Sequence, residues 1–204
     1  EQFFIGIGAM HETEIYQKLL STWQNPEALV YESKEPLFPL TQPEWQPDKL
    51  GFAEKMMYWD ALSYLPNDIL VKVDRASMAV SLEARAPLLD QRIYEYVWSL
   101  PVNFKIRDAQ GKWLLREVLA RHLPRALFER PKQGFAMPVG NWLNGPLKDW
   151  SESLLDKKPL KADGILNSEM ITDIWNEHKN GQGNHAERLW CILMFQSWKE
   201  KWLD

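Results

Sequence analysis

Residues 64–90 constrain the fold of this chain more than any other stretch. After Pro66, a residue that the interior of a helix tolerates poorly, apolar side chains recur at helical spacing. Asn67 or Asp68 is suited to cap the first turn. The apolar stripe consists of Ile69, Val73, Ala76 and Val80. The pattern predicts a largely buried helix over about residues 67–83.

A different face of this predicted helix carries charge. Asp68, Lys72 and Arg75 stand at positions i, i+4 and i+7, and a second pair, Glu83 and Arg85, follows at the far end. Such a row is commonly a solvated ladder of weak ion pairs. Buried charges, in contrast, are usually paired or functional, so the expected burial favours a functional face.

Bulk properties exclude several classes of protein. The 204 residues carry a net charge of −4, which leaves no basic footprint for nucleic acid, and no run of about 18 apolar residues suggests a membrane span. The single cysteine, Cys191, cannot form an internal disulfide and fits a reducing cytoplasm. Its apolar neighbours predict a small core residue and no nucleophile. The four histidines lack metal-ligand spacing, so no metal site is expected.

The remaining periodicity is helical. Helices are expected over about residues 10–23, 49–64, 91–100, 112–122, 142–155, 167–179 and 185–202. Asp90 is a predicted N-cap, and so is either Asn167 or Ser168. The first half of the last helix, with Leu189 and Leu193, is expected to be buried. No convincing strand alternation occurs, so the fold class is predicted to be all-α.

The stretch from Arg130 to Gly140 cannot be regular helix or a central strand, because it holds two prolines and two glycines besides Lys132. A loop with such a preset backbone often lies over a functional site. A structural turn with solvated cations is the alternative.

Three blocks resemble the synthetase domain of glutamine-dependent asparagine synthetases. They read LPNDILVKVDRASMAVSLEARAPLLD, GKWLLREVLARHLP and RPKQGFAMPVGNWL, and they occur in the same order as in that family. The resemblance implies that residues 1–204 form a single helical fragment, the carboxy-terminal portion of an α/β synthetase domain of the adenine-nucleotide-alpha-hydrolase-like (PP-loop ATP pyrophosphatase) type.

The resemblance also implies a reaction. Aspartate would be activated by ATP with Mg²⁺ as a β-aspartyl-adenylate, and ammonia from glutamine would convert it to asparagine. The implied catalytic residues are Asp68, with Asn67 and Asp74 as alternatives, and Lys132. The implied substrate- or phosphate-binding residues are Lys72, Arg75 and Gly134. Glu83 and Arg85 are interpreted as a structural ion pair rather than as direct participants.

The departures from the family are as informative as the matches. The family's Ser-Gly-Gly-x-Asp-Ser nucleotide loop, its Gly-(Glu/Asp)-Gly-x-Asp segment and its amino-terminal glutaminase cysteine do not occur in the sequence. The fragment alone is therefore expected to be inactive and to hold no cofactor. A homo-oligomer is left open, because the sequence does not determine the oligomeric state. Two alternatives stay open: a related amidotransferase acting on another carboxylate, such as a sugar or antibiotic precursor, and a non-catalytic helical binding module.

Overall fold

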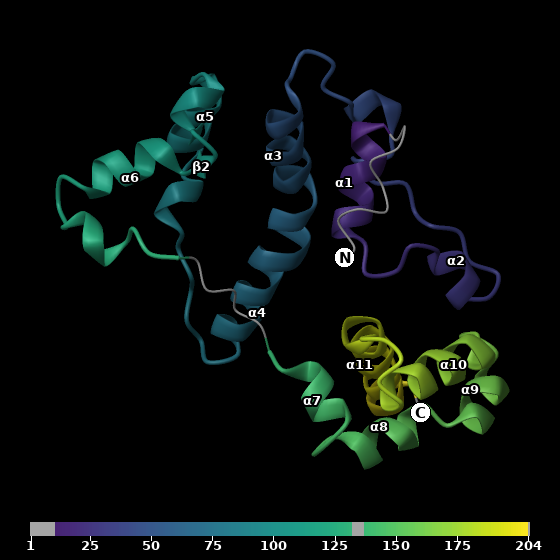
Figure 1. The fold of residues 1–204 in the computed structure, drawn as a ribbon. Coiled ribbons are helices and arrows are strands. Elements are labelled where there is room, and N and C mark those ends of the chain that lie inside the picture. The colour runs from purple at the N-terminus through teal and green to yellow at the C-terminus, as the bar shows by residue number, and fades with distance from the viewer. Residues whose placement is uncertain (1–10, 132–136, 204) are drawn as a thin grey trace. The chain divides into compact units, whose positions relative to one another are not determined.

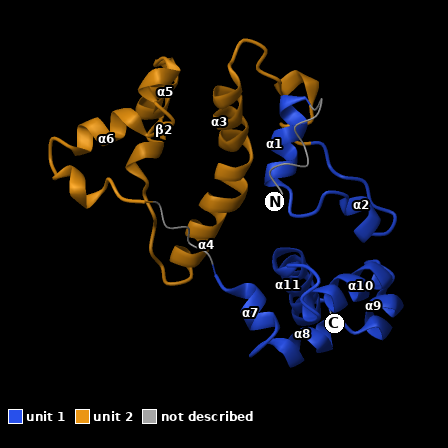
Figure 2. Cartoon of the chain, in the orientation of Figure 1, with its two compact units in different colours: residues 1–37, 135–204 blue, residues 38–134 orange. Residues whose placement is uncertain are grey.

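The computed structural model describes residues 11–131 and 137–203, and nearly all of its regular structure is helical (Figure 1). The predicted all-α class is confirmed, and the β-structure among the described residues is limited to two very short strands and one isolated bridge between Val30 and Leu166. The chain divides into two compact units (Figure 2). Unit 1 comprises residues 1–37 and 135–204, and unit 2 comprises residues 38–134.

Unit 1 is built from short helices and one long one. Its elements are α1 (Glu12–Leu20), α2 (Pro26–Leu29), α7 (Val139–Leu143), α8 (Lys148–Leu154), α9 (Lys157–Asp163), α10 (Ser168–Lys179) and α11 (Ala186–Trp202). The expected cap of α10 is confirmed, since the Asn167 side chain accepts a hydrogen bond from the Met170 N–H at 3.2 Å. A backbone bond from Asn167 N–H to the Leu29 carbonyl joins α2 to this helix start.

The core of unit 1 is one contiguous apolar cluster. The last helix supplies Leu189, Ile192 and Leu193, all at most 2% exposed, which confirms the expected burial of its first half. Leu143 of α7 and Ile171 of α10 are fully buried in the same cluster. Because these side chains come from segments far apart in the sequence, they stabilise the tertiary fold of the unit as well as its individual helices.

Unit 2 is a chain of helical segments with a small hairpin. Its elements are η2 (Pro43–Trp45), α3 (Phe52–Leu62), η3 (Leu65–Leu70), α4 (Val71–Met78), η4 (Pro87–Leu89), α5 (Gln91–Ser99), η5 (Val102–Phe104), β1 (Ile106–Arg107), β2 (Gln110–Gly111), α6 (Trp113–Leu119) and η6 (Arg125–Leu127). The strands pair antiparallel around Asp108 and Ala109, whose positive φ values of 51° and 59° form the tight turn. Asp90 caps α5 as expected by accepting the Arg92 N–H at 2.9 Å.

The expected helix start at Asn67 or Asp68 is wrong. Tyr64 has helical dihedral angles (φ −62°, ψ −45°), and the Asn67 N–H donates to the Ser63 carbonyl at 3.0 Å, so the backbone remains helical across Pro66. The turn there is a π-helix. A wider turn relieves the clash that a proline ring makes with the preceding turn, which explains how the chain passes Pro66 without a break.

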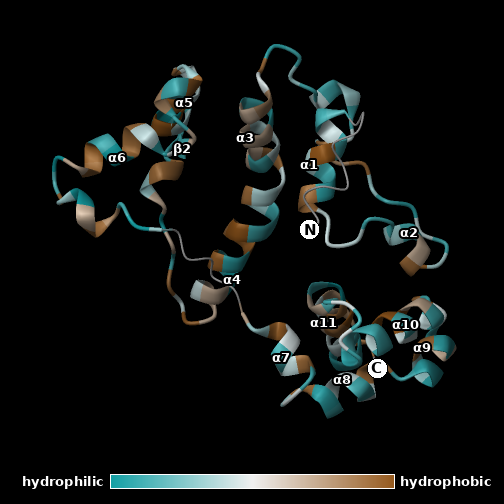
Figure 3. Cartoon of the chain, in the orientation of Figure 1, coloured by the Kyte–Doolittle hydropathy of each residue, from teal (hydrophilic) through white to brown (hydrophobic). Residues whose placement is uncertain are grey.

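The predicted burial of the helix after Pro66 is also wrong. Val73 and Val80 of the expected inner stripe are 46% and 68% exposed, and α4 contains no buried residue. The α-helix ends at Met78, and Ser81 adopts a left-handed conformation (φ 59°) just beyond it. Figure 3 shows hydrophobic and hydrophilic residues interspersed along α3, α4, α5 and α6. Periodicity therefore identified a helix here, but not a face covered by other residues.

Candidate functional site

The site begins with the ion pair of Asp68 and Lys72. The Lys72 ammonium lies 2.6 Å from the Asp68 carboxylate, one turn apart on the helical segment formed by η3 and α4. Asp68 and Lys72 side chains are 42% and 70% exposed, so both remain accessible to a ligand. The hydrogen bond to Asp68, and then its charge, raise the pKa of Lys72. Lys72 is therefore a cation at neutral pH, suited to binding phosphate or carboxylate oxygens and unsuited to accepting a proton.

Arg75 shares the α4 helix with Lys72, but its recorded partner is a different carboxylate. Its Nε atom lies 4.0 Å from Asp74, and both side chains are largely exposed. The expected row of three charges is thus divided into two separate ion pairs. Asp68 pairs with Lys72, and Arg75 lies at a longer distance from Asp74. Among the described residues Asp74 is the ion-pair partner of Arg75, whose side chain is 82% exposed and carries five N–H donors that suit an anion.

Glu83 and Arg85 lie beyond α4 rather than on it, because the helix ends at Met78. The Arg85 guanidinium donates to the Glu83 carboxylate at 3.0 Å, and the side chains are 67% and 81% exposed. An exposed pair two residues apart contributes little to stability. The interpretation of this pair as structural stays a prediction.

Two of the expected site residues, Lys132 and Gly134, lie outside the described residues. The structure therefore places Asp68, Lys72 and Arg75 on one helical segment, and the proximity of Lys132 to them stays a prediction.

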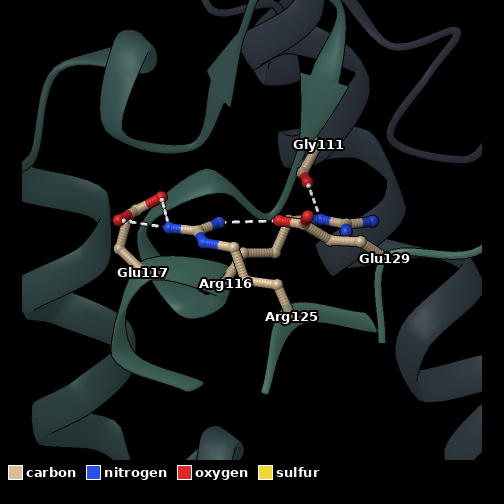
Figure 4. A network of polar contacts seen from close by, with 5 residues as sticks. All are labelled: Gly111, Arg116, Glu117, Arg125 and Glu129. Atoms are coloured by element: carbon tan, nitrogen blue, oxygen red, sulfur yellow. Dashed lines mark hydrogen bonds and ion pairs between the residues drawn. The ribbon is translucent and has the colours of Figure 1, made fainter. Parts of the chain in front are cut away.

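Sequence reasoning missed a polar network that includes the segment preceding Lys132 in the sequence (Figure 4). The Arg125 guanidinium donates to both carboxylate oxygens of Glu117 at 2.8 and 2.9 Å, and to Glu129 at 2.6 Å. Its hydrogen bonds to Glu117, then to Glu129, raise the pKa of Arg125. The i, i+4 spacing of Arg125 and Glu129 was a visible signal, but the partnership with Glu117 depends on how the chain turns after α6.

Cys191 is exposed, so its expected role as a buried core residue is wrong. On α11 the adjacent Ile192 and Leu193 are buried in the core, whereas Cys191 lies on an exposed part of the helix surface. Partial burial of the sulfur, followed by the charge of Glu187, raises the pKa of this thiol. A raised pKa disfavours the thiolate, which is the nucleophilic form of cysteine, and the absence of a nucleophilic role for Cys191 stays a prediction.

Neither a metal-binding cluster nor a membrane-spanning helix is found among the described residues. Over residues 11–131 and 137–203, no three His, Cys, Asp or Glu side chains gather where they could hold a metal ion. In the same part of the chain, no helix has both the length and the apolar character needed to cross a bilayer.

Comparison with known proteins identifies relatives over most of the chain. The family model described as asparagine synthase matches residues 8–200. A putative glutamine-hydrolysing asparagine synthetase of Mycobacterium tuberculosis H37Rv is 34% identical over 145 residues, which cover 71% of this chain and 22% of that protein. Asparagine synthetase 3 of Bacillus subtilis is 32% identical over 176 residues, covering 83% of this chain and 28% of the relative.

A mammalian protein gives a similar match. The rat asparagine synthetase is 33% identical over 146 residues, covering 66% of this chain and 25% of its own length. This chain thus spans about a quarter of the length of the curated relatives. No solved structure matches.

Proposed function

Since this chain belongs to the asparagine synthase family, we propose that the protein carrying it makes asparagine from aspartate, ATP and glutamine-derived ammonia. The family match over residues 8–200 carries the proposal. The names of the relatives supply the product and the hydrolysis of glutamine, and the use of ATP is taken from the family resemblance. The accessible Asp68–Lys72 pair supplies a site with suitable chemistry.

The proposed reaction has two steps. A carboxylate oxygen of aspartate attacks the α-phosphorus of ATP, and pyrophosphate leaves. Ammonia then attacks the acyl carbon, AMP leaves, and a proton is lost from nitrogen. Both steps move negative charge between oxygens, so cations placed beside those oxygens lower the barriers.

The residues of this chain are assigned roles that fit their environments. Lys72, held protonated by Asp68, stabilises negative charge on the adenylate or the leaving pyrophosphate. Asp68 orients Lys72 and keeps accessible oxygens for the ammonium or amine of a substrate. Lys132 contributes a second cation, a role taken from the resemblance. Among the described residues no three His, Cys, Asp or Glu side chains gather where they could hold a metal ion, and no step is assigned to a metal held by this chain.

The assay uses the protein as its gene encodes it, with aspartate, ATP and glutamine or ammonium. We expect asparagine and pyrophosphate in equal amounts. A protein that releases pyrophosphate with another carboxylate and not with aspartate would be a related amidotransferase. One that releases none with any carboxylate would refute the ligase proposal and favour a binding module. The 204 residues alone are expected not to bind ATP at micromolar concentration, because their sequence has no nucleotide loop.

The site assignment is tested by a matched pair of variants. Asp68→Asn removes the partner of Lys72 and is expected to lower kcat about 10²-fold, the usual scale for a misplaced catalytic group. Asp74→Asn changes an acid of the same helical segment that lies 4.0 Å from Arg75, and should leave kcat within about threefold. Equal losses would remove the distinction between the two acids, and loss only in Asp74→Asn would move the site to Asp74.

A further inference from the structure

We propose that Arg125 is a positioning residue: it fixes the direction in which the chain continues from η6 towards Lys132. The inference rests on the proposed role of Lys132 and goes beyond it, because neither the family match nor the names of the relatives assign Arg125 a role. Its basis is the network in Figure 4.

Arg125 links two segments that the sequence separates. Glu117 belongs to α6, whereas Glu129 lies beyond η6, three residues before Lys132. One guanidinium binds both carboxylates, with two bonds to Glu117 and one to Glu129. A planar guanidinium with bonds on two sides restricts direction as well as distance, which a single ammonium cannot do.

The backbone on either side supports this anchor. The Glu129 N–H donates to the Arg125 carbonyl at 2.8 Å, and the Leu127 N–H donates to the Pro124 carbonyl at 3.0 Å. At the other end of the network, Arg116 Nε donates to the Gly111 carbonyl at 3.2 Å and so connects α6 with β2 (Figure 4). The segment that leads to Lys132 is thereby connected to α6 and to the hairpin of β1 and β2.

The exposure of its side chains indicates that the network positions the segment leading to Lys132 more than it stabilises the fold. The side chains of Arg125, Glu117 and Glu129 are 45%, 39% and 35% exposed, and exposed ion pairs stabilise folded proteins weakly. A catalytic group displaced by about 1 Å, in contrast, can lose about 10²-fold in rate. Breaking the network should therefore affect catalysis far more than folding.

The experiment compares Arg125→Gln with Arg92→Gln in the protein as its gene encodes it. Arg92 is a suitable control because it also donates two bonds to one carboxylate, that of Asp90, but within the same turn. Arg125→Gln is expected to lower kcat about 10- to 100-fold with KM for aspartate changed less than about twofold, since positioning acts on the transition state. Arg125→Lys should recover part of the rate, and Arg92→Gln should retain kcat.

A second readout is independent of asparagine formation. Hydrogen exchange of the Leu127 and Glu129 amides should accelerate about two- to fivefold in Arg125→Gln and in Glu129→Gln, and remain unchanged in Arg92→Gln. Faster exchange with unchanged kcat would overturn the positioning role while the proposed function stands. Unchanged exchange would overturn the anchor itself. A wild-type protein that makes no asparagine would instead refute the proposed function.

Discussion

Unit 1 and unit 2 have similar local structure and very different interiors. Unit 1 buries a contiguous cluster that includes Leu143, Ile171, Leu189 and Leu193. In unit 2 the buried hydrophobic residues among those described are Leu40 and Trp59. Unit 1 is therefore stabilised by its apolar core, whereas the described part of unit 2 depends more on helix hydrogen bonds, caps and ion pairs.

The difference matters for the proposed function because the candidate site residues that the structure describes all lie in unit 2. Asp68, Lys72 and Arg75 are on a segment whose apolar residues are also accessible. Regions with few buried contacts open more readily, and binding segments are often drawn from them. The positioning of groups such as Lys72 then relies on directional polar contacts rather than on close packing.

The largest expected effect separates the two units directly. Leu193→Ala in α11 removes a fully buried side chain and should lower the free energy of unfolding by about 2–5 kcal/mol. Leu82→Ala in unit 2 makes the same chemical change at a residue that is 63% exposed and should cost less than about 0.5 kcal/mol. Urea unfolding followed by circular dichroism measures both. Comparable losses would mean that Leu82 is covered in solution.

Two glycines give a smaller contrast. A Cβ at Gly183 would lie 2.6 Å from the Nε2 atom of His185, whose ring also lies 2.7 Å from the Glu177 carboxylate. Gly183→Ala should therefore cost about 1–3 kcal/mol, as overpacking usually does. Gly111→Ala in β2 meets nothing within 4 Å and should be nearly neutral. Thermal unfolding of both variants tests this, and a neutral Gly183→Ala would show that the His185 ring moves freely.

Unit 1 should also respond to acid through His178. This ring is 4% exposed, stacks on Trp175, and its Nδ1 atom accepts the His185 N–H at 3.3 Å. Burial is the main cause that lowers the pKa of His178, with the neighbouring His185 adding to it and backbone contacts at Gly140 and Gly183 opposing it. Folding lowers the pKa of His178, so the folded state binds a proton at this ring less readily than the unfolded state does. The contribution of His178 to stability is therefore present above the unfolded pKa of about 6.5 and is lost as the pH falls below that value.

The measurement is the free energy of unfolding between pH 7.5 and 5. One titrating group gives a slope of at most about 1.4 kcal/mol per pH unit. His178→Gln should flatten the wild-type dependence over this interval. The control His122→Gln, which changes an exposed histidine of unit 2, should leave it intact. If the pH dependence of the free energy of unfolding is unaltered in His178→Gln, a group other than His178 causes the acid sensitivity.

The smallest effect concerns two lysine–aspartate pairs. Lys199 and Asp163 in unit 1 are 3.0 Å apart with side chains 13% and 25% exposed, so Lys199→Met should cost about 1 kcal/mol. Lys72→Met breaks the more exposed pair with Asp68 and should leave the melting temperature unchanged while asparagine formation falls. A clear loss of stability in Lys72→Met would assign this pair a structural role.

Several features were predictable because they depend on neighbours in the sequence. The caps at Asp90 and Asn167 bond to amides two and three residues ahead, and the buried half of α11 follows from apolar spacing. The pair of Asp68 and Lys72 follows from i, i+4 spacing alone. The order of three motif blocks was likewise sufficient to identify the family.

Other features needed the folded chain. The π-turn that carries the helix across Pro66 is local, but the apolar pattern gave no sign of it. Whether Val73 is covered and whether Arg125 pairs with Glu117 depend on segments that are not adjacent in the sequence. Local patterns specify hydrogen bonds over three or four residues, but burial and pairing depend on what the remainder of the chain brings alongside. Residue order thus predicted most of the helices, two caps and the family, whereas three-dimensional packing determined which side chains are exposed and that Arg125 pairs with Glu117.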